Sequence, residues 1–289
     1  MKTLQEQFLI AIARIEKFSP APLILARAMK LLRDPQSDLD SIASLVRSDP
    51  ALTADIIRCA NSAYYGASEP IQTIAEAVQK IGFRETVHLL NLAVARIAAG
   101  RDLGSYGISA DDFWAESLFN GLFLRNLAAA TAGANADEAY TVGLLRFIGR
   151  LAINQGIHDL GGGLFWPGDV AIADWERENV GFIQAQAGAL LLAKWQFPDE
   201  MIQAIAGQDG PDPQQKPSWL AGALHFASVL LPQGLGAPFH SSLREAAPAS
   251  SISSDFMPQY RLTPTEAEAL IAATRQDYDR VRQELGSPG

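Results

Sequence analysis

Apolar residues recur every three to four positions along most of this chain, which is the spacing of one helix face. Phe8 and Ile12 lie four apart near the N-terminus, and Val87, Leu90 and Val94 continue the same spacing further along. No segment alternates strictly between apolar and polar residues, and β-branched runs are few. The pattern predicts an all-α protein with about a dozen helices.

Local capping residues predict where several helices begin. Ser109 and Ser218 precede helical segments, and Thr263 with Glu266 has the spacing of a capping box. Thr73 and Glu76 have the same spacing. The segment 113–133 is apolar around most of its circumference, so we expect it at the centre of the core.

Four further segments complete the expected organisation. One continuous helix is expected over 137–155, and shorter helices over 170–179 and 182–195. Residues 232–262 are rich in Pro, Ser, Gly and Ala, which favours an irregular excursion.

The segment 46–66, VRSDPALTADIIRCANSAYYG, has distinctive residues at both ends of a predicted helix. Asp49 and Pro50 are typical of an N-cap and of the first helical position, where the missing N–H of proline costs nothing. Polar and aromatic residues occupy the point where this helix ends and the chain turns: Asn61, Ser62, Tyr64, Tyr65 and Gly66. The upstream segment is FSPAPLILARAMKLLRDP. The downstream segment is IQTIAEAVQKIGF, whose predicted helix ends at Ile81-Gly82.

Together these motifs resemble the HDOD family, the HD-related output domains of bacterial signalling proteins. The resemblance is close over residues 18–83 and looser over most of the remaining chain. It implies an HDOD/HD-like multi-helix bundle forming one unit, 1–289, with two associated lobes. We expect an N-terminal helical lobe over about 1–100 and an HD-like helical lobe over about 108–289.

We interpret the family-motif residues as structural. Asp49 is expected to cap its helix, and Asn61 to act as a C-cap or as a buried hydrogen-bonding residue that fixes the turn. A role in ligand binding or recognition is the alternative for both. The full set expected to be structural is Asp49, Pro50, Asn61, Ser62, Tyr64, Gly66 and Gly82.

The chemistry of the HD superfamily is missing from the expected positions. The resemblance relates the chain to the HD superfamily, whose active members hydrolyse phosphate esters with metal ions and have an adjacent His-Asp pair in the motif GLLHDIG. This chain reads GLLRFIG, so Arg146 and Phe147 stand in those positions. Neither side chain can ligate a metal ion. Gln184 stands where the family pattern places His, and Gln208-Asp209 where relatives often have two histidines.

We therefore predict no catalytic residue, no metal ligand and no cofactor. The vestigial pocket is expected to contain Arg146, Phe147, Gln184, Gln208 and Asp209. A buried guanidinium needs a partner. For Arg146 we expect an acidic residue or backbone carbonyls from the segments of Gln184 or Gln208. The histidines have no metal-binding spacing; they are His88, His158, His225 and His240.

Charge and composition restrict the partners. The formal net charge is −9 and no run of Lys and Arg offers a basic patch, so neither nucleic acid nor an anionic membrane surface is expected as a partner. Cys59 is the only cysteine, which excludes an intrachain disulfide and fits a reducing compartment. No secretory signal and no apolar run of about 18 residues is present, which predicts a cytoplasmic protein.

The resulting functional hypothesis is a non-catalytic signal-transduction module, a pseudo-enzyme that acts through protein–protein interaction. The resemblance implies partners of the response-regulator type, with receiver or cyclic-di-GMP-related domains. No such domain is attached here, so we expect a stand-alone partner of signalling proteins. Two alternatives stay open: an HD-type metal-dependent phosphohydrolase with a rearranged site, and a sensor of a small anionic ligand or nucleotide that uses Arg146.

Overall fold

The computed structural model describes residues 3–14, 39–61, 70–82, 102–194, 197–209, 218–231 and 262–285. Helices dominate these residues, and the only strand-like pairing among them is an isolated antiparallel bridge between Leu103 and Ile108. The predicted all-α fold is confirmed. None of the helices in these segments is long and apolar enough to cross a bilayer.

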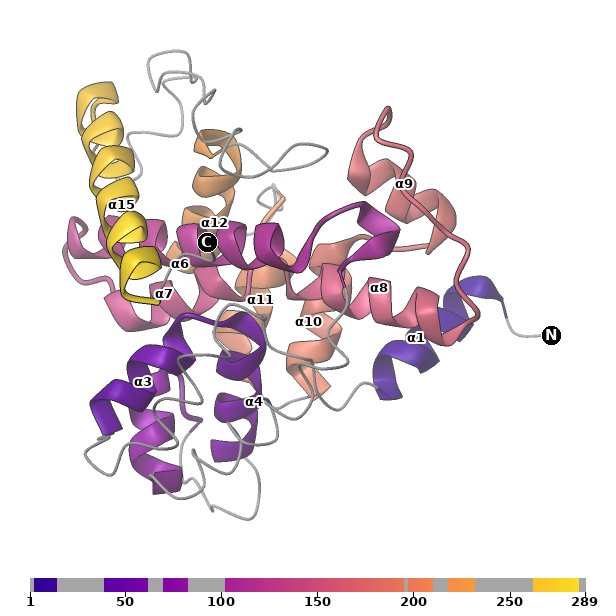
Figure 1. The fold of residues 1–289 in the computed structure, drawn as a ribbon, viewed down its shortest axis with the longest axis horizontal. Coiled ribbons are helices and arrows are strands. Elements are labelled where there is room, and N and C mark those ends of the chain that lie inside the picture. Colours follow the sequence, from indigo (N-terminus) through magenta and orange to yellow (C-terminus); the bar gives the residue numbers. More distant parts are fainter. Residues whose placement is uncertain are drawn as a thin grey trace.

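The helices follow one another along the chain, and Figure 1 shows their arrangement. They are α1 (Leu4–Arg14), α3 (Leu39–Arg47), α4 (Pro50–Ala60), the 3-10 helix η2 (Gly104–Tyr106), α6 (Ala110–Ala129), α7 (Ala136–Leu144), α8 (Ile148–Asp159), α9 (Ile172–Asn179), α10 (Gln184–Lys194), α11 (Asp199–Ala206), α12 (Trp219–Leu230) and α15 (Pro264–Leu285). A further helical stretch, 74–82, follows α4.

Side-chain caps start the helices where the sequence predicts them. The Ser109 hydroxyl accepts a hydrogen bond from the N–H of Asp112 at 3.0 Å, and α6 follows. The Ser218 hydroxyl accepts from the N–H of Ala221 at 3.2 Å before α12. The boxes Thr73/Glu76 and Thr263/Glu266 also form, each with hydrogen bonds in both directions. These local signals are sufficient to predict where the helices begin, because a cap satisfies N–H groups that the helix itself leaves unpaired.

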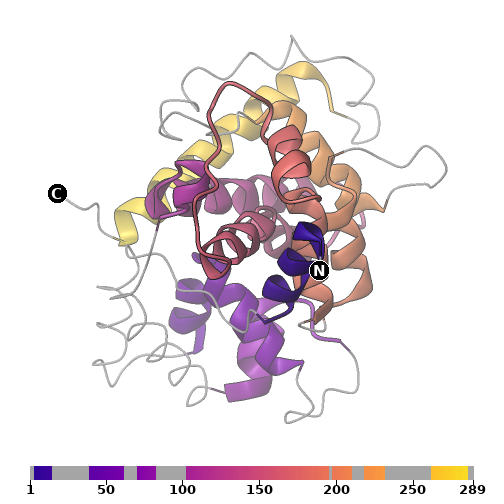
Figure 2. The same ribbon diagram turned by 90° about the vertical axis from the view of Figure 1, so that its right-hand side faces the viewer.

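Helix α6 lies at the centre of the fold, as its apolar circumference predicts, and other helices surround it (Figures 1 and 2). Helix α7 approaches it closely, since a Cβ atom added to Gly143 would lie 2.6 Å from the carbonyl oxygen of Asn120. The C-terminal helix α15 packs along α6, where the rings of Phe119 and Tyr278 meet edge to face with centroids 5.7 Å apart.

The prediction of one continuous helix over 137–155 is wrong. The chain forms α7 and α8, separated by a turn at residues 145–147. The reason is close packing on two sides. Gly143 meets α6, whereas Gly149 lies against α10, so closely that an added Cβ would be 1.8 Å from the carbonyl oxygen of Gln184. The turn lets both ends of the segment make these contacts.

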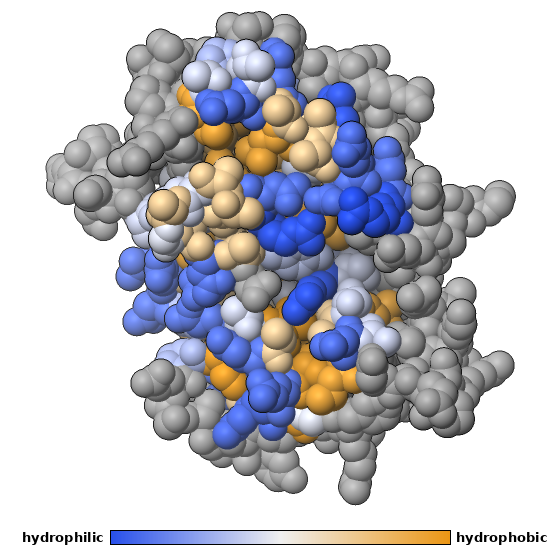
Figure 3. Space-filling model, turned by 90° about the vertical axis from the view of Figure 1, so that its left-hand side faces the viewer, coloured by the Kyte–Doolittle hydropathy of each residue, from blue (hydrophilic) through white to orange (hydrophobic). Residues whose placement is uncertain are grey.

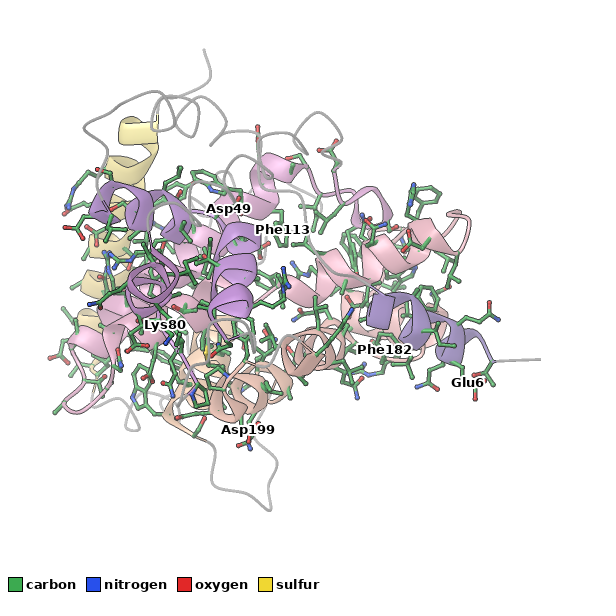
Figure 4. All side chains as sticks on the ribbon, turned by 90° about the horizontal axis from the view of Figure 1, so that it is seen from below. Glu6, Asp49, Lys80, Phe113, Phe182 and Asp199 are labelled. Carbon is green, nitrogen blue, oxygen red and sulfur yellow. The ribbon has the colours of Figure 1, made fainter. Side chains whose placement is uncertain are left out.

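The connection between α3 and α4 is anchored on the central helices. The indole N–H of Trp114 on α6 donates to the carbonyl of Ser48, and the hydroxyl of Tyr140 on α7 donates to the carbonyl of Arg47. Figure 4 labels Asp49, which follows Ser48 in this connection, and Phe113, which precedes Trp114 on α6. Since both donors are buried, the start of α4 is held to the core.

Helix α1 packs on α8 and α10, which lie far from it in sequence. The Phe8 ring lies against Gly156 of α8, so closely that an added Cβ atom would be 3.3 Å from it. The side-chain amide of Gln5 donates to the carbonyl of Gly181 at 3.2 Å. Glu6 and Phe182 mark this end of the molecule in Figure 4. The division into lobes over about 1–100 and 108–289 stays a prediction, and α1 contacts the second of these segments.

Candidate functional site

Arg146 and Phe147 occupy the turn between α7 and α8, and each is 2% exposed. The N–H of Arg146 donates to the carbonyl of Gly143 at 3.3 Å, and the N–H of Ile148 donates to that of Leu145 at 3.0 Å. The turn is therefore tightly hydrogen-bonded. It directs the Arg146 side chain into the protein interior toward α6.

Arg146 has an internal partner, but it is not the one expected. Its Nη1 atom donates to Oδ1 of Asn120 on α6. Gln208, just after α11, contacts the main chain of Arg146 instead, and its Nε2 atom donates to the Arg146 carbonyl at 3.2 Å. The guanidinium of Arg146 is thus held by an amide oxygen from α6, whereas the expected partners were an acidic residue or carbonyls from the segments of Gln184 or Gln208.

A second buried arginine completes the cluster. Nη1 of Arg150 on α8 lies 3.3 Å from Oε2 of Glu116 on α6, and both side chains are 2% exposed. The guanidinium carbon of Arg150 is 4.1 Å from the Phe147 ring centroid, and that of Arg146 is 4.7 Å away. Phe147 thus contacts two cations through its π face, a favourable arrangement where water is excluded.

The polar residues of α6 have the same spacing as the two arginines at the start of α8. Glu116 and Asn120 are four apart on α6, and Arg146 and Arg150 are four apart across the start of α8. Asn120 pairs with Arg146, and Glu116 with Arg150. The Asn120 amide also donates to the carbonyl of Glu116 at 2.8 Å, which fixes the orientation of its oxygen.

Glu176 on α9 adds a second buried carboxylate. Its Oε1 accepts a hydrogen bond from the Tyr106 hydroxyl at 2.9 Å, and its Oε2 accepts from the N–H of Gln184 at 2.7 Å. Burial raises the pKa of Glu176 to about 6, although the Gln184 hydrogen bond and the charge of Arg150 oppose this rise. Burial together with the nearby Glu176 also raises the pKa of Tyr106.

The buried charges balance. Arg146 and Arg150 carry two positive charges, and Glu116 and Glu176 carry two negative charges when ionised. Burial lowers the pKa of Arg146 to about 10, with the charge of Glu116 acting in the opposite direction. Arg146 therefore stays protonated at neutral pH, and the cluster carries no net charge while Glu116 and Glu176 are both ionised.

The structure brings together only part of the predicted pocket. Arg146, Phe147 and Gln208 are in contact, and Gln184 joins them through its backbone bond to Glu176. Asp209 is exposed and takes part only through its charge, which acts on Arg146 at a distance. Sequence reasoning missed the remaining polar members of the cluster: Tyr106, Glu116, Asn120, Arg150 and Glu176.

The residue types at this site do not fit the divalent metal that HD-type chemistry requires. Oε1 of Gln184 and of Gln208 are buried with no hydrogen-bond partner in the described segments, so two neutral oxygens are available. They lie in a cluster where two guanidinium groups already neutralise the two carboxylates, which leaves no free anionic ligand for a cation. Nowhere in the described segments do three or more His, Cys, Asp or Glu residues come together as possible ligands. No hydrolytic step through a metal follows from this arrangement.

The family-motif residues that can be located lie at helix ends. Asn61 pairs with the backbone of Ile71 in both directions: its amide donates to the carbonyl at 3.1 Å, and its oxygen accepts from the N–H at 2.8 Å. Asp49 is buried before α4, which begins at Pro50. Gly82 has a positive φ of 82°, which suits the end of a helix.

The rest of that motif falls outside the described residues, as do two of the histidines. These positions are Ser62, Tyr64, Tyr65, Gly66, His88 and His240. The structural role of the turn after Asn61 stays a prediction, which the paired bonds to Ile71 favour.

Comparison with known proteins identifies a family whose model matches this chain. The family model of the HDOD domain matches residues 19–211. The chain is 27% identical over 201 residues to an uncharacterized protein of Treponema pallidum (strain Nichols). That match covers 66% of this chain but 37% of the relative, which is therefore much longer than the matched segment.

Two solved structures share the fold. The MmoQ response regulator from Methylococcus capsulatus str. Bath is 21% identical with a TM-score of 0.61, and the match covers 86% of this chain and 99% of that one. A virulence factor from Campylobacter jejuni subsp. jejuni is 20% identical with a TM-score of 0.67, and the match covers 92% and 96% of the two chains. At these identities the likeness concerns the fold alone.

Proposed function

The chain belongs to the HDOD family, and we propose that it is a non-catalytic signal-transduction module that acts through protein–protein contacts. The observation that carries this proposal is the cluster around Arg146 and Phe147. At the positions where active relatives have His and Asp, this chain has a guanidinium bonded to Asn120 and a ring that contacts two cations. Such an arrangement serves packing and offers no metal ligand at these two positions.

A rearranged phosphohydrolase fits these residues less well. A hydrolytic metal needs anionic or imidazole ligands with an open coordination position. Both oxygens of Glu176 already accept hydrogen bonds, and Glu116 pairs with Arg150. Binding a metal ion here would require breaking those pairs beside two fixed positive charges.

A sensor of small anions is also disfavoured. The Arg146 side chain is 2% exposed and bonded to Asn120, and the charge of Glu116 already acts on it. The buried atoms Oε1 of Gln184 and of Gln208 are acceptors, which repel an anion. The signalling role agrees with the resemblance to a response regulator in fold. We propose a cytoplasmic setting for it on the sequence alone.

The test combines metal content with hydrolysis. The full chain, purified without chelator, should contain far less than one equivalent of Mn, Fe, Ni or Zn. It should not accelerate hydrolysis of bis(p-nitrophenyl) phosphate when Mn²⁺ or Mg²⁺ is added. Stoichiometric metal together with hydrolysis that Glu176→Gln abolishes would identify an enzyme and overturn the proposal. Glu268→Gln, the same substitution at an exposed carboxylate on α15, serves as the control.

A further inference from the structure

The loop between α8 and α9, residues 160–171, presents apolar side chains to solvent. Phe165 is 66% exposed, more than any other large apolar side chain in the described residues. Val170 is 46% exposed and Leu160 is 41% exposed, at the two ends of the same loop. Figure 2 shows this segment crossing the face that lies toward the viewer, between α8 and α9.

The exposure of Phe165 follows from how the backbone is held. Its neighbours Leu164 and Trp166 are partly buried and pack on the core, and in extended backbone alternate side chains point in opposite directions. Phe165 between them therefore faces outward. Pro167 keeps Trp166 in an extended conformation, which reinforces this alternation.

The loop is also fixed at several points. The N–H of Trp166 donates to the carbonyl of Ser105 in η2 at 2.7 Å, and its indole N–H donates to the carbonyl of Val170 at 2.9 Å. At the other end the N–H of Gly162 donates to the carbonyl of Ile157 at 2.8 Å and closes α8. A partner that binds Phe165 therefore has little loop entropy to overcome.

The surroundings of the loop are acidic. The exposed Asp, Glu, Lys and Arg residues of segment 158–178 are four carboxylates and one guanidinium: Asp159, Asp169, Asp174, Arg177 and Glu178. Arg177 already pairs with Asp174 at 2.6 Å. A second copy of this face would bring like charges together, and an anionic membrane would be repelled in the same way.

We propose that this loop, with Phe165 as its anchor, is a docking surface for a different protein that offers an apolar pocket rimmed by Lys and Arg. The pocket takes the Phe165 ring, with Leu160 and Val170 covering its edges. The basic rim complements the carboxylates of the segment. This inference rests on the proposed function, and it names the surface through which the module makes its contacts.

The experiment compares three versions of the full chain: wild type, Phe165→Ser and Leu39→Ser. Leu39 is 40% exposed on α3, at the opposite end of the long axis in Figure 1, so its variant is a matched apolar control. Figure 3 shows the side of the molecule that α3 and α15 occupy in Figure 1, where apolar groups are interrupted by hydrophilic side chains. Each version is immobilised and exposed to an extract of the source cells, and the captured protein is then purified.

The supporting result is quantitative binding by the purified pair. Titration calorimetry should give a Kd at least ten-fold weaker for Phe165→Ser and unchanged for Leu39→Ser. It should also show weaker binding when the salt concentration rises and when Asp169 is changed to Lys. All variants should keep the wild-type melting temperature, because the changed side chains lie on the surface.

The other results separate the two proposals. A partner bound equally well by Phe165→Ser overturns the docking surface and leaves the proposed function standing. Failure of every version to bind any protein overturns both. A dimer in light scattering that depends on Phe165, or Phe165-dependent sedimentation with phosphatidylcholine–phosphatidylglycerol vesicles, assigns the loop to another occupant and overturns the inference.

Discussion

Replacing Glu116 by Gln removes one of the two negative charges in the buried cluster and keeps the shape of the side chain. Glu116 lies 3.3 Å from Arg150, and its charge also favours the protonated form of Arg146. After the change, the two guanidiniums share Glu176 as their only buried carboxylate within the cluster. We expect the fold to lose stability because positive charge is then buried without compensation.

The expected loss can be estimated in two ways. With an effective dielectric constant of about 20, two unit charges separated by the distance of this pair attract one another by about 5 kcal/mol. Removing one partner of a buried ion pair typically costs about 3–5 kcal/mol. The isosteric change avoids a cavity, so packing adds little. We therefore expect the free energy of unfolding to fall by about 3–5 kcal/mol, a large part of the roughly 5–15 kcal/mol typical of a domain.

Urea unfolding of the full chain, followed by far-ultraviolet circular dichroism and tryptophan fluorescence, measures this loss. The midpoint should move to lower urea while the slope stays constant, which separates stability from a change in the unfolded state. Glu268→Gln on the exposed face of α15 is the matched control and should stay within about 0.5 kcal/mol of wild type. A second change, Arg150→Gln, removes the surplus charge, so the double variant should lose less than the sum of the single losses.

The result that refutes this reasoning is a Glu116→Gln variant as stable as the Glu268→Gln control. Additive losses in the double variant would also contradict it, since they would show that Glu116 and Arg150 do not interact. Either result would mean that the cluster is hydrated or rearranged in solution. The inference that this site is a self-contained packing unit would then fail.

Two further changes test other parts of the structure. Asn61→Ala should destabilise the fold by about 1–3 kcal/mol, because both backbone groups of Ile71 lose their partner. The exposed control is Lys80→Ala. If the two variants have the same urea midpoint and only Asn61→Ala loses partner binding, Asn61 has a recognition role instead. Burial raises the pKa of Glu176 from 4.5 to about 6, so the folded state binds this proton more tightly than the unfolded chain. The stability of wild type relative to Glu176→Gln should therefore be highest well below pH 4.5 and should fall by about 2 kcal/mol in all as the pH rises through about 6. A flat difference would contradict the assignment.

What the sequence predicts well is what short-range chemistry determines. The starts of α6, α12 and α15 depend on a hydroxyl and an N–H three residues apart, so Ser109, Ser218 and Thr263 identify them. The break between α7 and α8 has no comparable signal. Residues 145–147 are Leu, Arg and Phe, which are all compatible with a helix, and the turn depends on contacts with Asn120 and Gln184 that are distant in sequence.

The candidate site divides in the same way. The apolar neighbours of Arg146 predict its burial, and the prediction that no metal binds here rests on residue types alone. Its partner could not be found because Asn120 lies 26 residues away on another helix. One available signal was overlooked: Glu116 and Asn120 are polar residues four apart in the middle of a helix that is apolar around most of its circumference, and such residues require partners when buried.

The cluster differs from a metal site in its charge as well as in its ligands. A metal centre gathers anionic and neutral donors around one divalent cation. Here two fixed guanidiniums supply the same positive charge, and Glu116 and Glu176 neutralise it. Restoring His and Asp at positions 146 and 147 would still leave the charge of Arg150 inside the cluster, together with carboxamides at Gln184 and Gln208. In place of His and Asp at positions 146 and 147, the chain thus has buried contacts that make these two positions part of the core.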